Sequence, residues 1–327
     1  MAPSVSPLNW TGNKSCIYDM ISGFMPEHTR YIEPCMGSAE VFMRKKPAES
    51  EIINDFNGDL TTFFRVVKSE TRVQQLIGRL FVSGNSEELF KERHELLART
   101  PNILDEVTDI VGSFRELTDE DVELAAAFFE NQIYSFSSTG GSFAIVKKNI
   151  KPKLDKILAA SNRLRNAIIL HRDYKDVINL FACPGGFIFF DPPYRGTEFM
   201  YRKSNFDGNE HEIVFCLMND VNKKYGGECK FLITYNNDPY IRSLAERYGF
   251  ETYVQRRIHS MAQSRKKKQT SEEAPPGSEA ESPKEEKKYF EELLIANYSL
   301  VKQANRNHFY YSENCEQLGL FEYNPDY

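Results

Sequence analysis

The sequence has no apolar run long enough to cross a membrane, and its start, Met1 to Ser4, lacks the basic and apolar regions of a signal peptide. We therefore expect a cytoplasmic protein. Its six cysteines are scattered, without the C-x-x-C spacing and companion histidines of a zinc site. We expect reduced, mostly structural thiols and no bound metal.

The length and composition allow a soluble enzyme with room for one large domain plus an insertion. The 327 residues are 41% hydrophobic and 13% aromatic, which excludes a disordered or fibrous chain and allows a substantial core. The net charge of -6 argues mildly against unspecific nucleic-acid binding. It decides nothing about a local site, because a basic cleft can lie on an acidic protein.

The amino-terminal third has the pattern of a strand, loop, helix and second strand. A short strand from Tyr31 leads to a helix that begins near Ser38, and residues 51–55 form a second strand that ends at Asp55. In such units the terminal carboxylate accepts hydrogen bonds from ribose hydroxyls. Of the glycines that usually form the phosphate-binding loop of such a unit, only Gly37 is present. This disfavours NAD or FAD as the ligand, but it matters less for a ligand without phosphates. Alternatively, Asp55 is a turn or helix-capping acid.

The only tryptophan lies in a compact loop before this unit. Trp10 can pack on an adenosine or a methionine chain, and Lys14 can present its ammonium to a carboxylate or phosphate. For the loop taken alone, the simpler interpretation is preferred: Trp10 anchors the amino-terminal segment to the core, and Lys14 is solvated.

The most informative segment is 186–194. Its first five residues predict a strand buried on both faces, and the two prolines after Asp191 end that strand in a rigid turn at the edge where α/β sheets bind ligands. Asp191 and the carbonyl of Pro192 can each accept one N–H of an exocyclic amine on a nucleobase, and Tyr194 can stack on the base. The alternative is an ordinary proline loop.

A large insertion separates the two halves of this pattern. Roughly 135 residues lie between Asp55 and Asp191, whereas a plain βαβ step needs about 30. Residues 61–97 and 118–133 have the amphipathic spacing of core helices, and we assign them no contact role. A hydroxylated, turn-rich segment and a run of lysines follow, which suit either a loop on DNA or a solvated loop. The predicted DNA contacts in this segment are Ser137, Ser138, Thr139, Lys147 and Lys148.

Near the carboxyl end, residues 256–260 and 290–298 predict the two strands of a hairpin. The connection 264–288 has almost no apolar residues, so we expect disorder there. Its basic start either grips the DNA backbone or is merely solvated. Arg257, within the first strand, is a further predicted DNA contact.

Four segments in this order resemble the Dam-like, alpha-group DNA adenine-N6 methyltransferases. They are Trp10-Thr11-Gly12-Asn13-Lys14, Glu33-Pro34-Cys35-Met36-Gly37, Asn54-Asp55-Phe56-Asn57 and Asp191-Pro192-Pro193-Tyr194, and the match continues through 167–174, 232–239 and 292–298. The resemblance spans nearly the whole chain. It implies an α/β fold with a Rossmann-like S-adenosylmethionine-dependent methyltransferase core and an inserted, mainly helical target-recognition domain.

Carried over position by position, the resemblance implies a set of functional residues and S-adenosylmethionine as the cofactor. The implied cofactor contacts are Trp10, Lys14, Glu33, Gly37, Asp55, Asp173 and Asp191, although Asp173 is as easily a loop cap. The implied catalytic residues are Asp191, Pro192 and Tyr194. The predicted core is 1–70 and 161–303, the predicted recognition domain is 71–160, and 304–327 is predicted to pack on the core as a tail.

The predicted function is site-specific methyl transfer to the N6 amine of an adenine flipped out of double-stranded DNA. We expect a monomer, and a restriction-modification partner is a further expectation. The arginine-bearing recognition hairpin of the best-known members has no clear counterpart, so their G-A-T-C target does not carry over. An RNA-directed adenine methyltransferase and a catalytically silent DNA-binding relative remain alternatives.

Overall fold

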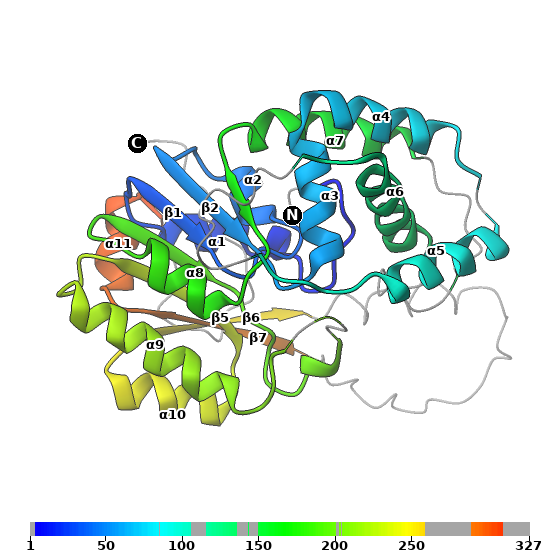
Figure 1. Ribbon diagram of the computed structural model, residues 1–327. Coiled ribbons are helices and arrows are strands. Elements are labelled where there is room, and N and C mark those ends of the chain that lie inside the picture. The colour runs from blue at the N-terminus through cyan, green and yellow to red at the C-terminus, as the bar shows by residue number, and fades with distance from the viewer. Residues whose placement is uncertain are drawn as a thin grey trace, which may run out of the picture.

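A seven-stranded sheet with helices on both faces forms the centre of the molecule (Figure 1). The computed structural model describes residues 4–84, 86–105, 116–135, 143, 150–200, 203, 205–258 and 289–309. The strands are β1 (Arg30–Glu33), β2 (Ser50–Asn54), β3 (Ile168–Leu170), β4 (Gly186–Phe190), β5 (Lys230–Asn236), β6 (Glu251–Ile258) and β7 (Tyr289–Ala296). Their order across the sheet is β3-β2-β1-β4-β5-β7-β6.

The first five strands are parallel, and β7 lies antiparallel between β5 and β6. This arrangement is an α/β fold of the Rossmann-like type, as predicted. The predicted strand at 186–190 coincides with β4, whose five residues are all buried. The predicted late hairpin is also confirmed, because Glu251 to Ile258 pair in register with Ala296 to Tyr289.

The helices alternate with the strands and then accumulate between β2 and β3 (Figure 1). They are α1 (Tyr18–Phe24), α2 (Glu40–Arg44), α3 (Gly58–Lys68), α4 (Glu70–Phe81), α5 (Glu87–Arg99), α6 (Asp119–Tyr134), α7 (Lys151–Leu164), α8 (Tyr174–Phe181), α9 (Glu210–Lys224), α10 (Pro239–Tyr248) and α11 (Leu300–Arg306). Side-chain caps begin several of them; Asn57 caps α3, and Thr118 forms a capping box with Asp121 at α6.

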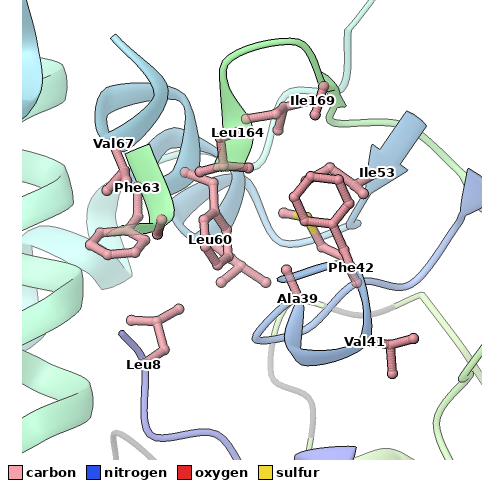
Figure 2. Packing of buried hydrophobic residues seen from close by; sticks show 14 of the residues in the cluster. Leu8, Ala39, Val41, Phe42, Ile53, Leu60, Phe63, Val67, Leu164 and Ile169 are labelled. Atoms are coloured by element: carbon pink, nitrogen blue, oxygen red, sulfur yellow. The ribbon is translucent and has the colours of Figure 1, made fainter. Parts of the chain in front are cut away.

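Alternate residues of each strand enter two separate layers of core. Phe187 and Phe189 of β4 face the layer that holds α1, α3 and α11, whereas Ile188 and Phe190 face the layer under α8, α9 and α10. Figure 2 shows part of the first layer, where Phe42 and Ile53 lie beside Leu60 of α3. Both faces of the sheet are therefore covered, which explains the continuous apolar runs of its parallel strands.

The helices α4 to α7 share the first layer instead of forming a core of their own. Buried side chains of α4, α5 and α6 belong to the same cluster as those of β1 and β2. The helix α6 packs against α3, α4 and α5, and α7 packs against α3. The assignment of 71–160 to target recognition stays a prediction, but the described residues of this range are mainly helical, as predicted.

The carboxyl-terminal helix α11 lies against α1. Phe309, just after it, stacks edge-on against Phe24 and fills the space beside Gly23, where an added Cβ would lie 2.2 Å from the Phe309 ring. Tail residues from 310 onward lie outside the described residues. None of the helices within the described ranges has the length and apolar character needed to span a bilayer. In the same part of the chain, no group of three or more histidine, cysteine or acidic side chains is placed to bind a metal.

Candidate active site

A cavity of about 470 Å³ lies at the carboxyl ends of the parallel strands. Its wall begins with the loop 10–14, continues through the segments that follow β1, β2 and β3, and includes Asp191 and Pro193 after β4. The four segments noted in the sequence therefore meet around one space. Because this edge of an open α/β sheet is where ligands bind, the cavity is the candidate active site.

Lys14 and Asp191 form an ion pair at this cavity, with 2.6 Å between Nζ and Oδ2. Lys14 is 7% exposed, and its Nζ also donates to the Gly12 carbonyl at 2.8 Å. The simpler interpretation, a solvated lysine, is therefore wrong. The other oxygen of Asp191, Oδ1, accepts a hydrogen bond from Thr234 Oγ1 at 2.6 Å. Both carboxylate oxygens thus have fixed partners.

Tyr194 lies beside this ion pair, with its ring centre 4.9 Å from Lys14 Nζ. Its hydroxyl donates to a carboxylate oxygen of Glu292 on β7. Burial raises the pKa of Tyr194 well above its usual value, and the charges of Glu292 and Asp191 raise it further. Tyr194 therefore stays protonated and remains a donor. Neither Tyr194 nor the buried Pro192 is part of the cavity wall.

Gly37, in the loop after β1, makes a close approach to Trp10. Its φ of +47° is in the left-handed region, and an added Cβ would lie 2.8 Å from Trp10 Nε1. Only glycine fits both conditions without a shift of the neighbouring ring. The Gly37 N–H donates to Asp55 Oδ2 at 3.0 Å, so the loops after β1 and β2 are tied together.

Asp55 combines the two roles that the sequence left open. Its Oδ1 accepts from the Asn57 N–H at 2.9 Å, which is the interaction of a turn acid, and its side chain also lines the cavity. Burial raises the pKa of Asp55 to about 6, although the N–H groups of Asn57 and Gly37 act in the opposite direction. Its oxygens are placed to accept hydrogen bonds from hydroxyl groups of a ligand.

Glu33 ends β1 and lines the same cavity while being only 2% exposed. Burial raises the pKa of Glu33 to about 8, and the charge of Asp191 also raises it, whereas the hydrogen bond from the Tyr31 hydroxyl at 2.8 Å lowers it. Glu33 is consequently mostly protonated at neutral pH. It presents a neutral polar group beside the charged Lys14 and Asp191.

Asp173 caps the first turn of α8. Its Oδ1 accepts from the Lys175 N–H and its Oδ2 from Asn205 Nδ2, both at 2.9 Å. The capping alternative therefore describes what the structure shows. Asn205 and Tyr174 line the cavity and Asp173 does not, so a contact of Asp173 with a cofactor stays a prediction.

The inserted helices complete the cavity wall, which their amphipathic spacing did not indicate. The lining residues from α5 and α6 are His94, Leu97, Ala98, Phe128, Asn131 and Gln132. Asn131 Oδ1 and Gln132 Oε1 are buried and accept no hydrogen bond within the described residues. Since buried amide oxygens normally have donors, this wall suits a ligand that brings N–H or O–H groups.

Five predicted DNA contacts, Ser137, Ser138, Thr139, Lys147 and Lys148, lie outside the described residues, as does the segment 264–288. Arg257 lies in β6, opposite Phe290 of β7, and its side chain is not among those the structure describes. The predicted roles of these residues stay predictions.

The sheet order and the position of the cavity define a Rossmann-like α/β fold with a ligand site at its carboxyl edge. The family described as D12 class N6 adenine-specific DNA methyltransferase matches residues 10–264, which is most of the chain. The chain belongs to this family. The match covers the loop that contains Lys14 as well as the turn that contains Asp191 and Tyr194.

Two relatives carry names of the same kind. The chain is 26% identical over 262 residues, or 75% of its length, to a DNA N-6-adenine-methyltransferase of Escherichia phage P1, of which it covers 31%. It is 27% identical over 189 residues, or 57% of its length, to the type II methyltransferase M1.LlaDCHI of Lactococcus lactis subsp. cremoris, of which it covers 64%. The chain thus spans about a third of one relative and less than two thirds of the other.

Proposed function

We propose that this chain transfers a methyl group from S-adenosylmethionine to the N6 amine of adenine in double-stranded DNA. The observation that carries the proposal is the position of Asp191 after β4, on the wall of the cavity and paired with Lys14. Membership of the D12 family supports the reaction type, and the name of the phage P1 relative supports DNA adenine as the acceptor.

The residues around the cavity fit S-adenosylmethionine. Asp55 offers carboxylate oxygens for the ribose hydroxyls, and Lys14 offers an ammonium for the carboxylate of the methionine end. Trp10 packs over the loop at Gly37, which together with Glu33 would border the methionine chain. When bound, S-adenosylmethionine supplies an activated methyl group on its sulfonium. No phosphate cradle is needed for this ligand, in agreement with the single glycine of the loop.

Asp191 and the Pro192 carbonyl would act directly on the acceptor. An adenine amine is a poor nucleophile because its lone pair is delocalised into the ring. Two acceptors on its N–H groups direct that lone pair toward the methyl group and stabilise the positive charge that develops on nitrogen. Tyr194 would stack on the flipped base, since its ring lies next to Asp191 and its hydroxyl is held by Glu292.

Contacts with the duplex would come from the inserted segment and the late hairpin. We assign them to Ser137, Ser138, Thr139, Lys147 and Lys148, together with Arg257 in β6, on the grounds of residue type and family resemblance. A cytoplasmic monomer that acts beside a restriction enzyme is the cellular setting we propose. The type II designation of the lactococcal relative supports that setting.

The test is expression of this chain in a host without DNA methylation, followed by long-read mapping of N6-methyladenine. Asp191→Ala serves as the matched inactive control. Modified adenines in one sequence context, absent from the control, are the expected result. An unmodified genome, although the purified protein binds S-adenosylmethionine, would overturn the proposal in favour of an RNA acceptor or a silent DNA binder. Transfer of labelled methyl groups to RNA in competition with duplex DNA then separates these two.

A further inference from the structure

Two buried polar side chains, Thr234 and Glu292, stand next to the Asp191–Tyr194 turn without lining the cavity. They lie on neighbouring strands, since Asn236 of β5 pairs with Glu292 of β7 and Thr234 pairs with Leu294. Their exposures are 0% and 1%. No residue of the cavity wall comes from β5 or β7, so neither side chain is placed to touch a ligand in it.

Both side chains make hydrogen bonds to the turn. Thr234 Oγ1 donates to Asp191 Oδ1 at 2.6 Å, and the Tyr194 hydroxyl donates to Glu292 Oε1. The Thr234 side chain also lowers the pKa of Tyr194, which burial and the charges of Glu292 and Asp191 raise. The first and the last residue of the turn are therefore each held by a buried polar side chain from a neighbouring strand.

These two polar side chains stand out because the strands around them are apolar. Leu232, Ile233, Leu293 and Leu294 are all fully buried. A hydroxyl and a carboxylate in such surroundings lower stability unless they are hydrogen-bonded, and a Val and a Leu would fill similar space at no such cost. Stability alone therefore does not explain why Thr and Glu stand at these two positions.

We propose that Thr234 and Glu292 are positioning residues for the methyl transfer proposed above, on which this inference rests. Thr234 holds Oδ1 and so fixes the rotation of the Asp191 carboxylate, which leaves Oδ2, beside Lys14 on the cavity wall, to accept from the amine as well. Glu292 fixes the Tyr194 ring at the angle needed to stack on the base. Both act through the turn and neither touches the substrate or the cofactor.

Thr234→Val tests the first contact because it removes the hydroxyl and keeps the shape of the side chain. Loss of a hydrogen bond to a charged group predicts a rate of methyl transfer lower by about 10- to 100-fold. Thr234→Ser restores the hydroxyl and should recover most of the rate. Thr252→Val on β6, where the side chain is exposed, is the matched control and should leave the rate unchanged.

Glu292 is tested by the same logic with a second pair of variants. Glu292→Gln keeps an acceptor for the Tyr194 hydroxyl and should stay within a few-fold of the wild-type rate. Glu292→Leu removes the acceptor and should reduce the rate about as much as Thr234→Val. This pair keeps the proposal testable if Thr234→Val does not fold.

The experiment measures single-turnover transfer of labelled methyl groups to unmethylated DNA, together with the affinity for S-adenosylhomocysteine by calorimetry. The inference is supported if Thr234→Val transfers methyl groups slowly but binds S-adenosylhomocysteine within about twofold of the wild-type affinity, and if Thr234→Ser recovers the rate. If Thr234 had only a structural role, Thr234→Val would change affinity and rate together, and Thr234→Ser would not restore the rate selectively.

A Thr234→Val or Glu292→Leu enzyme as fast as wild type overturns this inference alone. A wild-type protein that methylates no DNA overturns the proposed function, and this inference with it.

Discussion

The ammonium of Lys14 lies 2.6 Å from the carboxylate of Asp191 and 4.9 Å from the centre of the Tyr194 ring. A loop that precedes the first strand thus contributes a charge to the turn that follows the fourth. The two segments are far apart in the sequence, and both lie within the family match, which covers residues 10–264. Their contact places both in a single site.

Asp191→Ala should lower the rate of methyl transfer by about 100- to 1000-fold and leave cofactor binding partly intact. In the proposed mechanism this carboxylate accepts from the target amine, and loss of one such group has an effect of this size on the rate. The measurement is transfer of labelled methyl groups to unmethylated DNA, with S-adenosylhomocysteine affinity determined by calorimetry. A variant with a normal rate would remove Asp191 from the mechanism.

Lys14→Met should lower both the stability and the affinity for the cofactor. Its side chain is 9% exposed and that of Asp191 is 20% exposed, so the change leaves a carboxylate largely buried without its cation. Breaking a buried ion pair lowers the free energy of unfolding by about 3 kcal/mol, and the loss is somewhat smaller here because Asp191 is partly solvated. Urea unfolding measures the loss.

The surface pair Lys91–Glu87 provides the matched control for Lys14. Its side chains are 66% and 62% exposed, so Lys91→Met should leave the free energy of unfolding nearly unchanged. The double variant Lys14→Met with Asp191→Asn should recover part of the lost stability without recovering activity. Strictly additive losses in this cycle would show that the two side chains do not interact.

Cofactor affinity should increase as the pH rises through about 6. Burial raises the pKa of Asp55 from 3.8 to about 6, and only the ionised form is purely an acceptor for ribose hydroxyls. Calorimetry with S-adenosylhomocysteine from pH 5 to pH 8 would measure the effect. Asp55→Asn should bind more weakly and with a flatter pH profile; a wild-type affinity that is constant over this range would contradict the assignment.

The raised pKa of Asp55 has the opposite effect on stability: cofactor affinity rises with pH, whereas the free energy of unfolding falls. The folded protein holds the Asp55 proton more tightly than the unfolded chain, so the free energy of unfolding falls as the pH rises from 3.8 to about 6. Above that pH the loss is complete. Urea unfolding of wild type and Asp55→Asn should therefore differ more at pH 7 than at pH 4, in favour of the variant.

Gly37→Ala should destabilise the protein by roughly 1–3 kcal/mol. The substitution forces a side chain into a left-handed backbone conformation and within 2.8 Å of Trp10 Nε1. Combining it with Trp10→Ala should relieve the steric part of the loss and leave the backbone part. Gly208→Ala is the control, because an added Cβ there meets no atom within 4 Å; an equal effect at both glycines would contradict the account.

The strands and the turn after β4 could be predicted because their signals are local. An apolar run followed by Asp191 and two prolines identifies β4 and its end without knowledge of its neighbours. Asp55 was found in the same way, at the end of a short apolar strand. For these residues, position along the strand decides which edge of the sheet they reach.

Thr234 and Glu292 were not predicted because their roles depend on which strands become neighbours. Thr234 meets Asp191 only because β5 lies beside β4, and Glu292 meets Tyr194 only because β7 enters the sheet antiparallel to β5. Asn131 of α6 was also not predicted to line the cavity, for the same reason. Its helix has an ordinary core pattern, and only the packing of the inserted helices against α3 brings it to the cavity.

The pairing of Ile258 with Tyr289 gives the late hairpin a further property. The chain leaves the sheet at one of these residues and returns at the other, so the two ends of the intervening segment are held side by side by the ladder itself. Changes in the length of that segment need not strain any strand. Because Glu292 pairs with Asn236 at the carboxyl end of β5, these two ends lie at the same edge of the sheet as the turn at Asp191, and Phe290 next to one of them stacks on Tyr194. The intervening segment therefore leaves and rejoins the sheet beside the candidate active site.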